Sequence, residues 1–248
     1  MRILVCIKPH IMEKDIGPFE SIALEAGLQL GEEGVVDVIT AGPDHWVDTI
    51  YRALGMGADN GIHILTDSGD PHGGLVPASV TAGMLSAFVM SRRPDQAYDL
   101  IITGVMSQDL MAGQTGPMTA AYLDIPCVTA VVRAEQTGES LLIRREWEGG
   151  YWETLEMGFP ALISIQAGQY TPRYPALSHM LKAKDKPLTV IRALSEICST
   201  NQIPGQIPKE RFSGLRMPEQ TRKGEVVRGT LADQVRAFET FLQERNLT

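Results

Sequence analysis

The chain has 248 residues, of which 44% are hydrophobic, so it can bury a substantial core. Its 22 basic and 30 acidic residues give a formal net charge of -8, which excludes the large electropositive surface that nucleic-acid binding requires. Every apolar run is shorter than the roughly 20 residues that a membrane-spanning helix needs. We therefore expect a cytoplasmic protein with no nucleic-acid partner and no membrane insertion.

The three cysteines and five histidines are scattered along the chain. Cys6, Cys127 and Cys198 form no C-x-x-C pair, and the histidines lack the spacing of metal ligands. The sequence also contains neither a P-loop nor the G-x-S-x-G motif of many hydrolases. These patterns predict no disulfide framework, no metal site and no catalytic residue, and they favour the cysteines as small core side chains.

The first two-fifths of the chain alternates between two hydrophobic patterns. Short apolar runs predict four buried strands, at residues 2–8, 35–40, 61–65 and 100–103. Between them, apolar residues recur at helical spacing in residues 22–30, 47–54 and 80–88. Strands that alternate with helices imply a parallel sheet covered on both faces. The sequence therefore predicts a doubly wound α/β fold.

The pattern changes after residue 127. Closely spaced strand candidates follow, at residues 128–133, 140–147, 151–157 and 161–165. Glu148-Gly149-Gly150 supplies turn residues between the middle two, which predicts a hairpin added to the parallel sheet.

The C-terminal part is rich in proline and poor in apolar runs. From Thr171 onward such a stretch buries little by itself, but it ends in a predicted amphipathic helix after an N-cap candidate, Thr230. We expect an α/β domain in residues 1–190 and an extended arm in residues 191–248. The arm either wraps a partner or folds onto its own domain, and the sequence alone does not separate the two.

Loops at the carboxyl ends of parallel strands are where open α/β sheets bind ligands. Three such loops are rich in glycine or proline: Gly17-Pro18-Phe19-Glu20, Ala41-Gly42-Pro43, and residues 104–113 with the following Gln114-Thr115-Gly116-Pro117-Met118-Thr119. Thr115 is a candidate cap for a helix that Pro117 helps to start, and free N–H groups at that helix start would suit a phosphate. Neutral hydroxyls and amides hold a phosphate without cleaving it, so the predicted site is non-catalytic.

Several segments in order along the chain carry a resemblance to a known family. They include residues 2–8, 52–59, 99–104, 114–120 and 172–177, together with Glu148-Gly149-Gly150 before Glu153-Thr154-Leu155. The chain resembles the beta subunit of electron transfer flavoprotein, related to the FixA-like proteins, over nearly its whole length.

The resemblance implies an adenine-nucleotide-binding (alpha hydrolase-like) α/β fold that binds AMP, or a second FAD in electron-bifurcating members. It also implies a heterodimer with an alpha subunit, and the alpha subunit holds most of a shared FAD. The heterodimer would pass electrons between a dehydrogenase and an acceptor. Carried over residue by residue, the nucleotide-binding residues are Cys6, Gly17, Pro18, Phe19, Glu20, Ala41, Gly113, Gln114, Thr115, Gly116, Pro117, Met118 and Thr119.

The resemblance further implies a recognition segment for acyl-CoA dehydrogenase-type partners, with Leu177 as the anchor and Lys182 and Lys184 beside it. A small apolar anchor with nearby lysines suits a transient contact. The alternative is a surface helix in which Leu177 and Leu181 pack inward.

The chain departs from the family pattern in two loops. The loop after the first strand reaches Gly17 quickly, and Val105, Met106 and Met111 stand where relatives carry charged or amide side chains. These changes leave the choice between AMP and FAD open. Two other functions stay open as well, an ATP-using enzyme and a nucleotide-sensing protein of the same fold.

Overall fold

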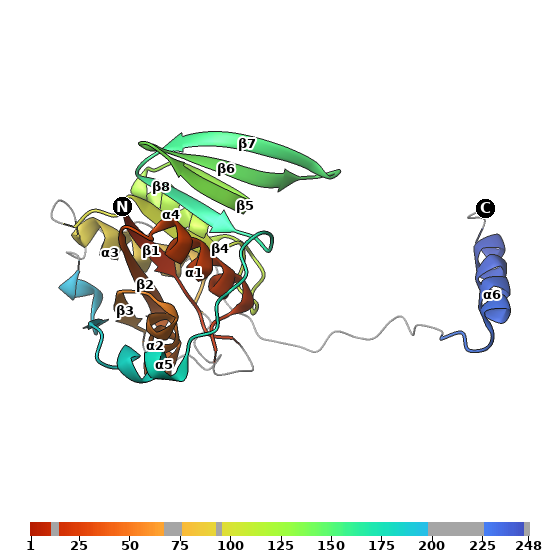
Figure 1. Cartoon of the computed structure of the whole chain (residues 1–248), viewed down its shortest axis with the longest axis horizontal. Coiled ribbons are helices and arrows are strands. Elements are labelled where there is room, and N and C mark those ends of the chain that lie inside the picture. Colours follow the sequence, from red (N-terminus) through yellow and green to blue (C-terminus); the bar gives the residue numbers. More distant parts are fainter. Residues whose placement is uncertain (11–14, 67–75, 93–95, 198–225, 246–248) are drawn as a thin grey trace. The chain divides into compact units, whose positions relative to one another are not determined.

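The computed structural model describes residues 1–10, 15–66, 76–92, 96–197 and 226–245. The chain divides into two compact units, residues 1–211 and residues 212–248. The first unit is built on a nine-stranded sheet with the strand order β7-β6-β5-β8-β4-β1-β2-β3-β9 (Figure 1). Its strands are β1 (Arg2–Cys6), β2 (Val35–Gly42), β3 (Asn60–Leu65), β4 (Leu100–Gly104), β5 (Cys127–Thr137), β6 (Ser140–Trp147), β7 (Tyr151–Gly158), β8 (Ala161–Ile165) and β9 (Leu188–Ile191).

Helices cover both faces of this sheet. They are α1 (Pro18–Leu30), α2 (Val47–Met56), α3 (Ala78–Ser91), α4 (Thr115–Leu123) and α5 (Leu177–Ala183), with two 3-10 turns, η1 (Asp44–Trp46) and η2 (Leu194–Glu196). The predicted doubly wound α/β fold is confirmed, because the pairings between β5, β8, β4, β1, β2, β3 and β9 are parallel.

Alternate side chains of the central strands pack into two separate hydrophobic cores. Ile3 and Val5 of β1 pack in a cluster that includes Leu24 of α1. Leu4, which lies between them, belongs to a second cluster with Phe88 of α3. Since successive side chains of a strand point to opposite faces, a strand buried on both faces must be apolar throughout. Burial of each Leu, Ile or Phe side chain stabilises the fold by about 1.5–3 kcal/mol. The continuous apolar runs therefore predicted these strands correctly.

The strand order reverses between β1 and β4. The chain adds β2 and β3 on one side of β1 and then returns to place β4 on the other side. Parallel strands end at the same edge of the sheet, so the loops after β1, β2 and β4 meet there. This topological switch point positions the candidate site.

The predicted hairpin is also present. β6 and β7 pair antiparallel over their whole length, and Gly149 and Gly150 form the turn at φ 82° and 79°. β5 pairs in parallel with β8 and antiparallel with β6, and its register with β8 shifts between Val128 and Val131. Ala130, at φ 57°, lies within this irregularity, which is typical of a bulge that redirects a strand.

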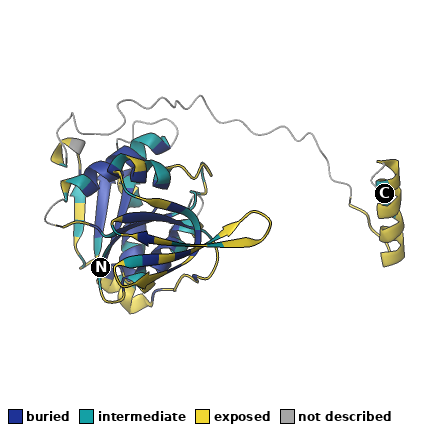
Figure 2. Cartoon of the chain, turned by 90° about the horizontal axis from the view of Figure 1, so that it is seen from above, coloured by how far each residue is buried: buried dark blue, intermediate teal, exposed yellow. Residues whose placement is uncertain are grey.

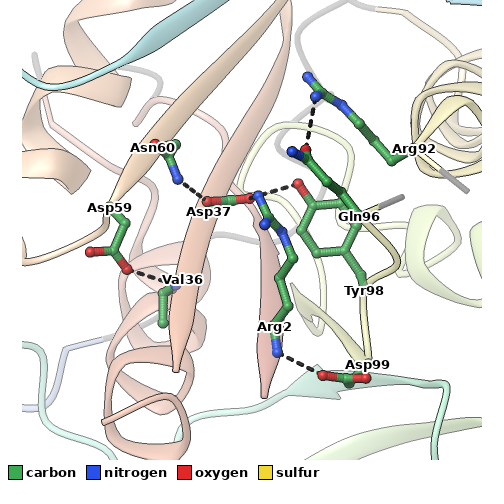
Figure 3. A network of polar contacts seen from close by, with 9 residues as sticks. All are labelled: Arg2, Val36, Asp37, Asp59, Asn60, Arg92, Gln96, Tyr98 and Asp99. Atoms are coloured by element: carbon green, nitrogen blue, oxygen red, sulfur yellow. Dashed lines mark hydrogen bonds and ion pairs between the residues drawn. The ribbon is translucent and has the colours of Figure 1, made fainter. Parts of the chain in front are cut away.

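A polar network lies at the amino edge of the sheet, where Arg2 begins β1 and Asn60 begins β3 (Figure 3). Asp37 of β2 is only 1% exposed, and its carboxylate accepts hydrogen bonds from Arg2 at 2.7 Å, Asn60 at 2.6 Å and Tyr98 at 2.8 Å. A buried charge is tolerated when it is paired and fully hydrogen-bonded. The network ties together β1, β2, β3 and the segment before β4.

β9 was not predicted from the sequence, and α5 was anticipated only as a surface helix in the alternative to the recognition segment. β9 extends the sheet in parallel beside β3, and Lys186 in front of it donates to the backbone oxygens of Leu54 at 3.1 Å and Ala58 at 2.6 Å. α5 packs on α2, where Met180 lies against Gly55. Both elements are short and follow several prolines, so neither has a periodic pattern long enough to read.

The described part of the second unit contains α6 (Leu231–Glu244), which is exposed along its length (Figure 2). The predicted N-cap is confirmed: Thr230 and Asp233 form a capping box with reciprocal side-chain hydrogen bonds. Phe238 and Phe241 stack with their centroids 6.4 Å apart. None of the described helices is long and apolar enough to cross a membrane.

Candidate nucleotide site at the switch point

A pocket opens at the carboxyl edge of the sheet, where the strand order reverses. Its wall combines the ends of β1 and β2, the loop after β4, the first turn of α4 and the first half of α3. Seven of the predicted nucleotide-binding residues line it: Cys6, Glu20, Ala41, Gly113, Gln114, Thr115 and Gly116.

Six predicted residues are not among those that line the pocket: Gly17, Pro18, Phe19, Pro117, Met118 and Thr119. Gly17 is the N-cap residue of α1, and the other five lie in α1 or α4, close to lining residues. Thr119 is fully buried, and its hydroxyl donates to the backbone oxygen of Thr115 at 2.7 Å. Such residues shape the backbone of the site without facing the pocket.

The start of α4 differs in detail from the prediction. Gln114 is the N-cap residue, and no side chain caps the helix, so the predicted capping role of Thr115 is wrong. Thr115 is instead the first helical residue. A capping hydroxyl belongs to the residue just before the first helical one and accepts from a backbone N–H two or three positions later, and Thr115 is already inside the helix. The first-turn N–H groups therefore carry no side-chain acceptor and no acidic residue, which is the arrangement that suits an anion.

Part of the pocket wall is apolar. It is formed by Trp46 of η1 together with Val76 and Leu85. The Trp46 ring lies directly on Gly42, where any Cβ atom would overlap ring carbons. Gly42 therefore allows the indole to sit at the pocket. An apolar or aromatic surface opposite hydrogen-bond donors is typical of small-molecule sites.

Lys8 and Asp109 form an ion pair between the loop after β1 and the loop after β4. The Lys8 ammonium also lies 5.6 Å from the centroid of the Trp46 ring. Burial opposes ionisation of Asp109, but hydrogen bonds from Lys8 and Ser107 and the Lys8 charge outweigh it and hold the pKa of Asp109 below its ordinary value. Lys8, Trp46 and Asp109 were not among the site residues predicted from the sequence. Their position in loops that follow predicted strands was the available signal, but glycine-rich segments alone were singled out.

Two buried polar atoms of the pocket have no hydrogen-bond partner among the described residues. They are Oε2 of Glu20 and Oγ1 of Thr40, two of four such atoms in the described part of the chain. An unpaired buried polar atom costs about 1–3 kcal/mol. A ligand that supplied partners would remove that cost.

Cys6 lines the same pocket, but its thiol is unreactive at neutral pH. Burial raises the pKa of its thiol to about 12. The thiol therefore stays protonated at neutral pH and packs as a small neutral side chain, because the thiolate is the reactive form.

The electron transfer flavoprotein domain family matches residues 8–195. The chain is 34% identical to electron transfer flavoprotein subunit beta of Sus scrofa over 215 residues, which cover 83% of this chain and 81% of that protein. The subunit of the same name from Bacillus subtilis is 29% identical over 233 residues, covering 92% and 85%. That from Methylophilus methylotrophus is 25% identical over 244 residues, covering 96% and 89%.

The chain belongs to the electron transfer flavoprotein family. The resemblance drawn from its sequence segments is thereby confirmed, and so is a role in electron transport.

The predicted recognition segment of this electron transfer flavoprotein chain lies on and after α5. Leu177 and Leu181 are 77% and 68% exposed, so the alternative in which both pack inward is wrong. α5 turns Ala183 inward instead, which is fully buried, and Lys182 and Lys184 are exposed.

The chain before α5 is braced at two points. Arg173 donates to the carboxylate of Glu25 from Nε at 2.8 Å and from Nη2 at 2.9 Å. Arg52 lies 4.6 Å from the centroid of the Tyr174 ring. A two-point guanidinium contact fixes orientation as well as distance, so the segment that leads to Leu177 is held on α1 and α2.

Proposed function

We propose that this chain is the beta subunit of a heterodimeric electron transfer flavoprotein and that it binds an adenine nucleotide at the switch point. The nucleotide is AMP, or a second FAD if the complex bifurcates electrons, and an alpha subunit holds most of the electron-transferring FAD. The observation that carries the proposal is the pocket itself, in which seven residues carried over from the family line one cavity.

The residues of the pocket fit an adenylate group. The first-turn amides of α4 and the side chains of Gln114 and Thr115 suit a phosphate, and the Trp46 wall suits a base or a sugar face. Bound flavin supplies the redox chemistry, and the protein supplies position and electrostatics. No acid, base or nucleophile of this chain is required.

The surfaces outside the pocket suit contacts with other proteins. α6 carries exposed apolar side chains on a short amphipathic helix, including Val235, Phe238 and Phe241. We propose that residues 191–248 form an arm that clamps the alpha subunit in the cytoplasm. Leu177, with Lys182 and Lys184, would present a small apolar anchor to an acyl-CoA dehydrogenase-type redox partner.

The nucleotide content of the purified complex tests the proposal. The chain is co-expressed with its alpha subunit, the complex is denatured, and the released nucleotides are identified and counted by chromatography. AMP together with one FAD, or two FAD molecules, is the expected result. Replacing Ala41, which lines the pocket, by Phe should remove the AMP or the second FAD and leave the other FAD in place.

Ala97→Phe is the matched control, because Ala97 is exposed and not among the residues that line the pocket. A nucleotide content that Ala41→Phe leaves unchanged would place the ligand elsewhere. A colourless protein that turns over ATP would overturn the proposal in favour of an ATP-using enzyme.

A further inference from the structure

Three carboxylates are buried in the described part of the first unit, and they differ in their partners. Asp37 accepts three hydrogen bonds in the amino-edge network (Figure 3). Glu25, 4% exposed, accepts from Arg173 and from Gln29. Glu20 is 6% exposed, and its Oε2 has no partner among the described residues. The described part of the fold thus satisfies two of its buried acids and leaves one carboxyl oxygen of the third, at the pocket, without a partner.

The local geometry explains why Oε2 of Glu20 stays unpaired. Glu20 is the third residue of α1, where a Glu side chain commonly accepts from the N-cap backbone N–H. The N-cap residue is Gly17, and its N–H already donates to the backbone oxygen of Lys8 at 2.8 Å. Oε2 of Glu20 lies against Gly17, which has no side chain in the way, and finds no donor there.

The charged groups around Glu20 come from two other elements. Lys8 follows β1, and its ammonium is held by Asp109 from the loop after β4. Glu20 lines the pocket together with Lys8, but without a hydrogen bond from it. Among the described residues, one cation therefore shares this part of the pocket with two carboxyl groups, and the three groups together carry a net charge of -1 when Glu20 is ionised and 0 when it is protonated.

Titration of Glu20 falls in the neutral range. Burial raises the pKa of its carboxyl to about 7, and the Asp109 charge adds to the rise, while its own backbone N–H and the Lys8 charge oppose it. A free protein at neutral pH thus holds both forms. The protonated form also gains an O–H donor, which an ionised carboxylate lacks.

We propose that a phosphate-bearing nucleotide binds this pocket together with one proton, which Glu20 takes up from solvent. The inference rests on the proposed function. A phosphate dianion and an ionised Glu20 in one pocket repel each other, whereas a protonated Glu20 removes the repulsion and can donate a hydrogen bond. Glu20 thereby links nucleotide occupancy to pH.

The linkage has a defined direction. The bound dianion favours the protonated form of Glu20, so the bound protein retains its proton to a higher pH than the free protein. The affinity for the dianion is then independent of pH while Glu20 is protonated in both the free and the bound protein. It falls as the pH rises above about 7, and it levels off once Glu20 ionises in the complex as well.

Titration calorimetry tests the proton uptake directly. AMP is added to the full chain, freed of bound nucleotide, at about pH 7.5, where the phosphate is already a dianion. Measurements in two buffers of different ionisation enthalpy give the number of protons taken up. We expect up to about one proton per AMP, and an affinity that falls by up to about tenfold per pH unit above pH 7.

Glu20→Gln supplies the matched variant, because Gln has the shape of the protonated acid and cannot ionise. It should bind AMP with no proton uptake and with little dependence on pH. Adenosine, which lacks the phosphate, should show less uptake than AMP in the wild-type chain. AMP binding without proton uptake at every pH would overturn the linkage and leave the proposed function standing. Absence of AMP and FAD binding at any pH would overturn both.

Discussion

The pH dependence of stability offers a test of the Glu20 environment that needs no ligand. The pKa of this carboxyl rises from 4.5 to about 7 on folding. One pH unit corresponds to about 1.4 kcal/mol, so keeping Glu20 ionised in the folded protein costs up to about 3 kcal/mol. The folded protein holds the proton more tightly than the unfolded chain. The Glu20 contribution to stability is therefore fully present below pH 4.5 and is lost as the pH rises to about 7.

Glu20→Gln should remove this loss. The free energy of unfolding of the variant, relative to the wild type, should rise between pH 4.5 and 7 and stay up to about 3 kcal/mol higher at pH 8. Urea denaturation at a series of pH values measures the difference. Glu139→Gln is the control, because Glu139 lies exposed in the turn between β5 and β6, and its profile should parallel that of the wild type. If the Glu20→Gln profile also runs parallel, Glu20 is not the buried, unsatisfied acid described above.

Two further changes test the pocket wall and the recognition segment. Gly42→Ala should push the Trp46 ring out of place, cost about 1–3 kcal/mol and shift the tryptophan emission, whereas Gly158→Ala, with open space around it, should do neither. Leu177→Ala should slow electron delivery to the redox partner about tenfold at unchanged nucleotide content. The exposed Leu142 gives the control for it, and equal rates for the two Ala variants would remove Leu177 as the anchor.

Much of the architecture follows from the sequence because its signals are local. Buried parallel strands require apolar residues on both faces, so residues 2–8 and 100–103 marked β1 and β4 directly. The C-terminal helix was equally clear, since Thr230 caps it and its apolar residues recur at helical spacing. β9 was not predicted because a strand of four residues shows no readable hydrophobic period. Its stability comes from pairing with β3.

The position of the site could be predicted from the sequence, but several contacts within it could not. Glycine-rich loops after strands located the pocket, since the topology of a parallel sheet brings such loops together. The partners of Lys8 and the unsatisfied state of Glu20 depend on contacts between residues far apart in the chain, such as the ion pair with Asp109. No spacing within one segment encodes them.

The two strands at the borders of the sheet limit how this chain can join other proteins. β9 has only four residues and is followed at once by Arg192, and Pro187 precedes it. β7 carries Glu153 and Glu156 along its length. Short, charged or proline-flanked borders discourage the pairing of a foreign strand and the aggregation that would follow. Contacts with other proteins should therefore be made by side chains and helices. Such contacts can be reversed without breaking backbone hydrogen bonds of the sheet.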